Sequence, residues 1–365
     1  MRIFVFIVLF FLYADAVYLS NKSCKECHKA IFEEYEHSYH SKGYFNDILH
    51  RKVADTISTK KYDCAVCHMP AATNINNLVE GKIRPNEKDV RESDAVSCFF
   101  CHEIAYVKKS HRFNINVPTK QIEGYKPSLY GSLQNPDEND KHSSLHNPLY
   151  DKNVCKGCHS HKRNENDLLI FETMKDNETS KECIKCHMPY IPGGNENMNK
   201  RARTKHRSHY FPGIHDPEMR EKAVGLKLTI KENHNIIVSL KNKMPHSLIV
   251  QPAREMYLRV KLTRGDKTLW SNKNDKNAYF KYEYLKNNKE VVIPYSATKY
   301  KWKNNLDGNA TKIFDYSVKG LKKGDKITAS FYMIVAKKSC LRAINLKGSD
   351  LDRPLLAERV EKIVK

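Results

Sequence analysis

The string Cys-x-x-Cys-His occurs five times between residues 24 and 187 of this 365-residue chain. In such a string the two thiols bond covalently to one haem, and the histidine that follows ligates its iron. The sequence therefore predicts five covalently bound haem c groups. The attachment cysteines are Cys24, Cys27, Cys64, Cys67, Cys98, Cys101, Cys155, Cys158, Cys183 and Cys186, and the proximal ligands are His28, His68, His102, His159 and His187.

Disulfides and zinc sites are the competing interpretations of paired cysteines. A structural zinc takes four ligands, normally from two such pairs, so five pairs would leave one pair without a partner. Neither interpretation requires a histidine after every second cysteine. The eleventh cysteine, Cys340, lies outside the motifs, and we expect it to be a small buried apolar residue rather than a reactive thiol.

The N-terminus is typical of an export signal. Arg2 precedes an apolar run over residues 3–13, and Ala14-Asp15-Ala16 follows as a small-x-small cleavage site, which predicts a signal peptide over residues 1–16. The run is too short to span a bilayer, and an uncleaved N-terminal anchor is the alternative. Because haem c is attached after export, we expect a soluble periplasmic protein.

The formal net charge of +21 favours an acidic protein, a membrane surface or nucleic acid as partner, and export argues against nucleic acid. The propionates of five haems would remove about half of this excess. We expect redox partner proteins, namely a membrane quinol-oxidising donor and a periplasmic reductase. Association with a membrane surface is a further hypothesis, and a solvated lysine-rich face is the competing interpretation.

The distribution of the motifs predicts two parts and an α+β fold. We expect a mostly helical, loop-rich pentahaem domain over residues 17–222, an antiparallel β-sandwich over residues 223–348, and a terminal helix over residues 349–365. In the first part, apolar spacing predicts helix over residues 30–57 and again over 167–178, and a polar segment over 111–153 predicts a long loop.

The second part shows the alternation that is typical of strands. We expect strands over residues 226–231 and 236–240 with a turn at 232–235, and a hairpin over 257–270. Further strands are expected over 290–294, 312–318 and 326–336. This domain carries no haem motif, so we expect it to bind no cofactor and to serve in docking or packing.

Twelve histidines lie outside the motifs, enough to supply a second axial ligand to every iron. His40 follows His28 by twelve residues, too far along the predicted helix to reach its own haem but near enough to reach a neighbour. His111, nine residues after His102, and His209, just before the domain boundary, are the other leading candidates. His50, His146 and His161 have less local support, and His37 competes with His40.

These residues resemble the multihaem cytochrome c family that includes the tetrahaem electron carrier of ammonia oxidisers and its octahaem relatives. The resemblance rests on the first motif with Ser38-Tyr39-His40, two Cys-His-Met-Pro strings, and Ser208-His209-Tyr210-Phe211 with Gly213, and it spans about residues 20–215. It implies that His40 and His209 are distal ligands.

Relatives with a C-terminal β domain often begin it with Asn, then Gly-His, Pro-Thr-Gly and Arg. Asn242, His246 and Arg254 match that pattern here. Pro245 replaces the glycine, and residues 249–251, Ile-Val-Gln, replace Pro-Thr-Gly.

Two functions fit this sequence. An electron carrier needs irons with two histidine ligands each, which pass electrons without binding substrate. A reductase of a small nitrogen compound or sulfur oxyanion needs one haem with an open position. All five motifs end in His, and the Cys-x-x-Cys-Lys string typical of the catalytic haem of pentahaem nitrite reductases is absent, so the sequence favours the carrier and assigns no catalytic residue.

Overall fold

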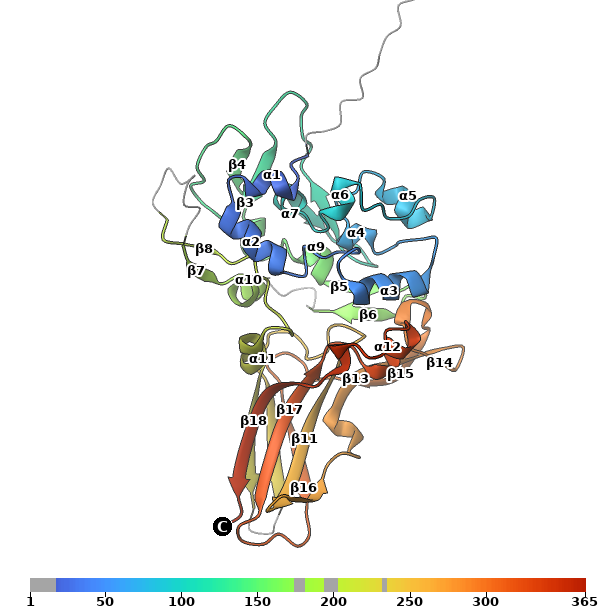
Figure 1. Ribbon diagram of the computed structural model, residues 1–365, viewed down its shortest axis with the longest axis vertical. Coiled ribbons are helices and arrows are strands. Elements are labelled where there is room, and N and C mark those ends of the chain that lie inside the picture. The colour runs from blue at the N-terminus through green and yellow to red at the C-terminus, as the bar shows by residue number, and fades with distance from the viewer. Residues whose placement is uncertain (1–17, 174–180, 194–202, 232–234) are drawn as a thin grey trace, which may run out of the picture.

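The computed structural model describes residues 18–173, 181–193, 203–231 and 235–365, leaving out the side chains of residues 181 and 182. The part that contains the five motifs lies above an elongated β part, and the C-terminus is at the far end of the strands (Figure 1). The predicted signal peptide and the turn at 232–234 fall outside the described residues.

Short helices alternate with two-stranded sheets in the motif-bearing part, so the prediction of a mostly helical domain is wrong. Each helix has four to ten residues because the chain turns repeatedly around five attachment sites. The helices are α1 (Asn21–Lys25), α2 (Lys29–His37), α3 (Ile48–Ile57), α4 (Ala65–His68), α5 (Ile75–Glu80), α6 (Val90–Ser93), α7 (Cys98–Glu103), α8 (Leu149–Lys152), α9 (Lys156–His159), α10 (Lys181–His187) and α11 (Pro217–Ala223).

Among the described residues, the strands of this part form four pairs, and the pair of Ser128–Gly131 with Ser143–His146 is the one parallel pair. The predicted loop over 111–153 therefore holds β2, β3, β4 and α8. The pairs are β1 (Ile104–Lys108) with β2 (Ile115–Pro118), β3 (Ser128–Gly131) with β4 (Ser143–His146), β5 (His161–Arg163) with β6 (Leu169–Glu172), and β7 (Tyr190–Pro192) with β8 (Lys205–Arg207).

Two helix predictions in this part need correction. The helix expected over 30–57 is divided into α2 and α3, because the chain turns at Gly43, where φ is +44° and a Cβ would lie 2.6 Å from the Cβ of Ala95. The helix expected over 167–178 is β6 over its described residues. Its backbone pairs with β5 across a turn in which Asp167 has φ +62°.

The C-terminal part has two antiparallel sheets whose buried side chains form one apolar core, which confirms the mixed α+β class. One sheet has the order β16-β10-β9, and the other has the order β14-β13-β11-β17-β18, with β12 beside β11 and β15 beside β13. The strands are β9 (Val224–Ile230), β10 (Asn235–Asn242), β11 (Glu255–Arg264), β12 (Lys267–Ser271), β13 (Tyr279–Lys286), β14 (Lys289–Val291), β15 (Lys299–Asn304), β16 (Thr311–Ser317), β17 (Lys326–Ile334) and β18 (Leu355–Ile363).

The terminal helix expected over 349–365 is wrong, because this segment forms β18 along the edge of β17. A short helix, α12 (Lys338–Ala343), precedes it and buries Cys340, which is 3% exposed as expected. Two further strands of this part, β13 and β15, were not predicted. In β13, Phe280, Tyr282 and Tyr284 are buried at every second position, a clear alternation.

Polar side chains join the two parts. The Asn164 amide, 2% exposed, donates hydrogen bonds to the carbonyls of Pro294 and Ala297, both at 2.8 Å. The Tyr295 hydroxyl donates to Asp63, and the Tyr300 hydroxyl donates to the Leu169 carbonyl. The β part therefore supports the segment that carries the second and fourth motifs.

Candidate functional site

Each motif forms one helical turn, which brings its two thiols to the same side of the chain. The backbone N–H of the motif histidine donates to the carbonyl of the first cysteine in the motifs of His28, His68 and His159, at 2.9, 3.0 and 2.8 Å. Residues three apart share a helix face, so both thiols of a motif point the same way. None of the ten motif cysteines forms a disulfide in the described part of the chain, so their thiols suit attachment to haem.

Thiols of different motifs lie against one another. Cys24 of the first motif is in hydrogen-bonding contact with Cys98 of the third. Cys67 of the second motif makes the same kind of contact with Cys158 of the fourth. Cys155 of the fourth motif also makes it with Cys183 of the fifth. The attachment sites are therefore contiguous rather than separate.

Backbone carbonyls fix the orientation of two proximal histidines. Nδ1 of His102 donates to the carbonyl of Tyr130, and Nδ1 of His187 donates to the carbonyl of Pro212, both at 2.6 Å. A histidine that donates its Nδ1 proton in this way keeps the lone pair of Nε2 free to ligate a metal. The surroundings of these two rings therefore suit a metal ligand.

Three motif histidines face a second histidine at the spacing of two axial ligands. Metal–nitrogen bonds of about 2 Å on each side of an iron, plus about 1.2 Å from each nitrogen to its ring centre, require about 6.4 Å between ring centres. The observed separations are 6.3 Å for His28 and His142, 6.4 Å for His102 and His209, and 5.9 Å for His159 and His40.

Burial keeps these rings in the form that binds metals. It lowers the pKa of His40 and that of His209 to about 3. The pKa values of His68, His102 and His159 are also lowered, again chiefly by burial. The rings are therefore neutral near pH 7, and neutral imidazole is the form that ligates metals.

Helix α2 holds the segment that carries His209. The Glu34 carboxylate, in a residue 5% exposed, accepts hydrogen bonds at 2.7 Å from the backbone N–H of His209 and from Nε2 of His206. Nδ1 of His206 faces the carbonyl of Gly193 at 3.0 Å. Both nitrogens of His206 thus have oxygen partners, so this ring is not placed as a metal ligand.

The Phe211 ring lies between two of the paired histidines. Its centroid is 4.3 Å from that of His40 and 5.8 Å from that of His209, with edge-on geometry in both contacts. The Phe211 backbone has φ +46°, a left-handed conformation that is costly for a bulky residue. Its ring thereby fixes the positions of two imidazoles that face different motifs.

The second motif is arranged differently. The rings of His68 and His50 stack at 3.6 Å with an interplanar angle of 11°, which is too close for a metal between their centres. Nε2 of His50 is 2.9 Å from the Tyr62 hydroxyl. Burial first, and then the ammonium of Lys162, lower the pKa of His50 to about 4. The Lys162 ammonium therefore lies near the second motif, and His50 is not placed as an axial ligand opposite His68.

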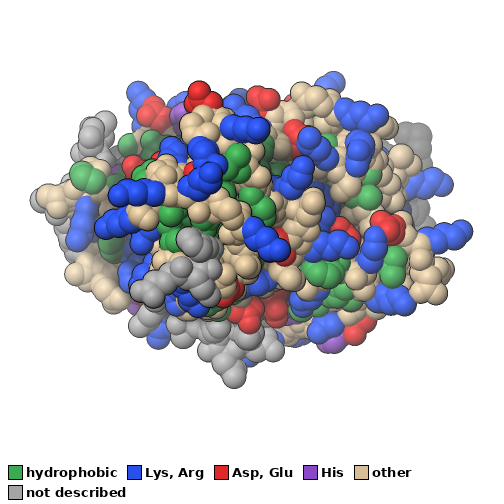
Figure 2. Space-filling view, turned by 90° about the horizontal axis from the view of Figure 1, so that it is seen from below, with side chains coloured by type: hydrophobic (Ala, Val, Ile, Leu, Met, Phe, Trp, Pro, Cys, Tyr) green, Lys and Arg blue, Asp and Glu red, His purple; other side chains and the backbone are tan. Residues whose placement is uncertain are grey.

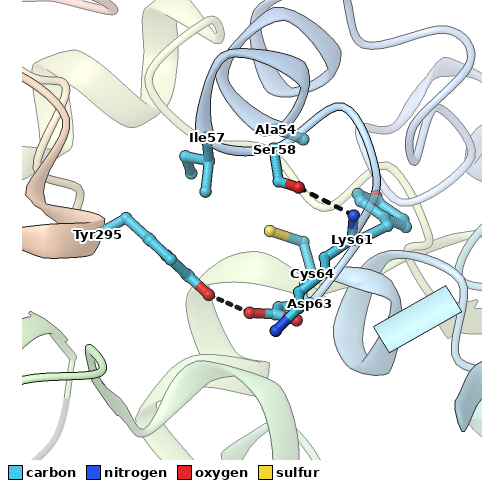
Figure 3. Close-up of a pocket in the computed structure, with 8 residues that line it drawn as sticks. Ala54, Ile57, Ser58, Lys61, Asp63, Cys64 and Tyr295 are labelled. Carbon is cyan, nitrogen blue, oxygen red and sulfur yellow. Dashed lines mark hydrogen bonds between the residues drawn. The ribbon is translucent and has the colours of Figure 1, made fainter. Parts of the chain in front are cut away.

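A small pocket opens beside the second motif (Figure 3). Cys64 points into it from one side, and the Tyr295 hydroxyl reaches Asp63 across it. Tyr295 belongs to the C-terminal part, so both parts of the chain line this attachment site.

At the fifth motif, His246 comes from the C-terminal part. Nδ1 of His246 donates to the carbonyl of Ser247 at 2.9 Å, and the buried Asn242 amide donates to the His246 carbonyl at 2.8 Å. Burial chiefly lowers the pKa of His246, and the nearby His187 and Arg254 side chains lower it further. Among the described residues no hydrogen bond occupies Nε2 of His246, and His187 is near enough to affect its pKa.

The structure brings His40 and His209 to motif histidines, but not His111. The His111 side chain is 69% exposed, and its Nε2 lies 2.6 Å from Asp167. Sequence reasoning missed His142, whose position in a long polar segment gave no local signal beyond the expectation that this segment covers the haems. Other protein atoms contact the remaining candidates: both nitrogens of His161, Nε2 of His146 and Nδ1 of His37.

Residues 23–103 match the family model described as cytochrome c554 and c-prime. The crystal structure of a penta-heme cytochrome c552 from Thermochromatium tepidum is similar over 95% of this chain and 99% of that chain, with a TM-score of 0.71 and 20% sequence identity. The chain has a multihaem cytochrome c fold. The resemblance predicted from the sequence is thereby confirmed, whereas no curated protein sequence matches.

Covalently bound haem c fits the residues of this cytochrome fold. The two cysteines of each motif lie on one helical turn, and the motif histidines His102 and His187 donate Nδ1 to backbone carbonyls. Within the described residues no helix is long and apolar enough to cross a bilayer.

Proposed function

We propose that this chain is a periplasmic electron carrier that holds five haem c groups. Five complete motifs support the number, and a penta-heme cytochrome has the same fold. Haem c supplies reversible one-electron chemistry when it is bound. The predicted signal peptide supports the periplasmic location, and a mature N-terminus at Val17 in the isolated protein would test it.

The observation that carries this proposal is the spacing of three histidine pairs at 5.9 to 6.4 Å. An iron with histidine on both faces has no position left for a substrate, which suits a carrier. His28 with His142, His102 with His209, and His159 with His40 are the proposed axial pairs. We also propose His246 as the partner of His187.

The contacts between motifs support transfer within the protein. Thiols of the first and third, the second and fourth, and the fourth and fifth motifs lie in contact. These residues would hold their groups side by side, without a stretch of apolar chain between them. We propose a membrane quinol-oxidising donor and a periplasmic reductase as the redox partners at the two ends.

Electron paramagnetic resonance of the oxidised protein tests the axial pairs. His40→Ala and His209→Ala should each convert one low-spin iron to high spin, because a strong axial donor is lost. His111→Ala is the matched control, since the structure leaves that ring exposed beside Asp167, and its spectrum should be unchanged. Low-spin spectra in both test variants would contradict the assignment.

A reductase with one open haem is the second candidate function, and the second motif favours it. His50 is stacked flat on His68 and its Nε2 faces Tyr62, so it leaves one axial position without histidine. The nearby Lys162 would attract a small anion. Rapid reoxidation of the reduced protein by nitrite, hydroxylamine or a sulfur oxyanion, without a partner protein, would support the enzyme over the carrier.

We also propose that the C-terminal part is a β-sandwich. The sheet β16-β10-β9 and the larger sheet share one apolar core, which is the relation expected of two packed layers. This part would pack against the attachment sites through contacts such as those of Pro294 with Asn164 and of Tyr295 with Asp63.

A further inference from the structure

Positive charge is concentrated in the part of the chain that has no haem motif. Residues 223–365 contain 30 Lys and Arg against 13 Asp and Glu, a formal net charge of +17. Residues 1–222 contain 33 against 29, a net charge of +4. Most of the net positive charge of the chain therefore belongs to the β part.

Six exposed lysines lie at the free end of this part, and we call them the lysine tip: Lys267, Lys319, Lys322, Lys323, Lys362 and Lys365. Contacts between strands bring them to one end. Arg264 pairs with Lys267 across the β11–β12 turn and donates to the Gly320 carbonyl. The Val364 N–H donates to the Asp325 carbonyl. In Figure 1 the C-terminus marks this end.

Acidic residues at this end do not neutralise the tip. The Asp325 carboxylate accepts two hydrogen bonds from Arg264, at 2.7 and 2.9 Å, and Glu361 pairs with Lys326 at 3.2 Å. Asp266 is exposed in the β11–β12 turn. Within the described part of the chain, none of the six tip ammonium groups forms an ion pair. Figure 2, seen from this end, shows Lys and Arg spread over the face with fewer Asp and Glu.

The lysine tip is remote from the attachment sites. Strand β11 runs from Glu255, next to the residues that approach the fifth motif, to Arg264 at the tip. Ten residues of strand span about 30 Å. Electron transfer weakens steeply with distance, so a redox protein docked at the tip would be badly placed. A positive surface far from the redox sites suits attachment instead.

An apolar side chain accompanies the lysines. Ile363 is 54% exposed and lies between Lys362 and Lys365 in the chain. Basic side chains beside an exposed apolar residue are a combination found at membrane surfaces, where cations meet lipid phosphates and an apolar group enters the interface.

We propose that the lysine tip binds the anionic headgroups of a lipid bilayer. The protein is then a peripheral membrane protein, with the β part standing on the bilayer and the five attachment sites held away from it. An acidic protein partner at the tip is the rival, and distance from the attachment sites disfavours it.

Co-sedimentation of the full-length holoprotein with vesicles tests this proposal. Vesicles of phosphatidylcholine and phosphatidylglycerol should bind the protein, vesicles of phosphatidylcholine alone should not, and raised ionic strength should release it. Replacing the three lysines of residues 319–323 with Gln should weaken binding about 100-fold, at about fivefold per lysine near an anionic surface. The matched control replaces three exposed lysines at the other end, Lys286, Lys289 and Lys338, and should bind nearly as well as the wild type.

Two outcomes would overturn the proposal. Equal weakening in both triple variants would mean that overall charge, and not the tip, attracts the bilayer. Unchanged vesicle binding in the tip variant, with slower salt-dependent electron exchange with an acidic redox protein, would assign the tip to a protein partner.

Discussion

Replacement of Glu34 by Ala is the sharpest test of how the distal histidines are held. Its buried carboxylate accepts two hydrogen bonds at 2.7 Å, one from the His209 backbone and one from His206. Removing this acceptor leaves buried hydrogen-bond donors without a partner and costs about 1–3 kcal/mol. We expect the free energy of unfolding to fall by that amount and the iron facing His102 to lose its low-spin signal in part of the molecules.

The assay combines denaturant unfolding, followed by far-ultraviolet circular dichroism, with electron paramagnetic resonance. Glu33→Ala, an exposed neighbour on α2, is the matched control and should change the free energy of unfolding by less than about 0.5 kcal/mol. A double-mutant cycle with His206→Ala should show coupling of about 1.5–3 kcal/mol, as expected for hydrogen bonds to a charged group. Additive effects of Glu34→Ala and His206→Ala, or equal spectra for the two α2 variants, would refute this reasoning.

Three other predictions concern haem number, Phe211 and Asp325. Intact-protein mass spectrometry should show the mature chain plus five haems, and each motif whose two cysteines are replaced by Ala should remove one. Phe211→Leu should shift the signals of two irons together, because its ring contacts both His40 and His209; a shift of one alone would contradict this. Arg264 holds the pKa of Asp325 at about 2, below its ordinary 3.8, so the pair stabilises the fold above about pH 4 and this contribution is lost as pH falls toward 2. Thermal unfolding from pH 6 to 2 should therefore show a steeper acid loss in the wild type than in Asp325→Asn, and parallel curves would contradict it.

The attachment chemistry and most strands of the β part were predictable because they depend on local patterns. Each motif is a contiguous string, and strands such as β10 alternate buried residues with less buried ones over their whole length. The segment over 351–364 also has apolar residues at helical spacing. This segment forms a strand and not a helix because it pairs with the edge of β17. That pairing satisfies the backbone hydrogen-bonding groups along the edge.

The proposed axial partners were only partly predictable because they come from segments that are distant in the sequence. His111 and His142 both lie in the polar segment after the third motif, and nearness in sequence favoured His111. The structure instead pairs the chain at β3 and β4, which brings His142 to His28, more than a hundred residues earlier in the chain. No local spacing pointed to His142, whereas the string around His209 did point to that histidine.

The buried amide of Asn164 has a consequence for the order in which the protein is made. Its two acceptor carbonyls are 130 and 133 residues further along the chain, so they leave the ribosome long after the fifth motif is complete. A chain that ends before Pro294 has every motif cysteine and histidine. In such a chain, however, Asn164 in the turn between β5 and β6 has lost both of its acceptor carbonyls. Premature termination before Pro294 is therefore a defect of the haem part as well, because residues synthesised after all five motifs complete the support of the fourth.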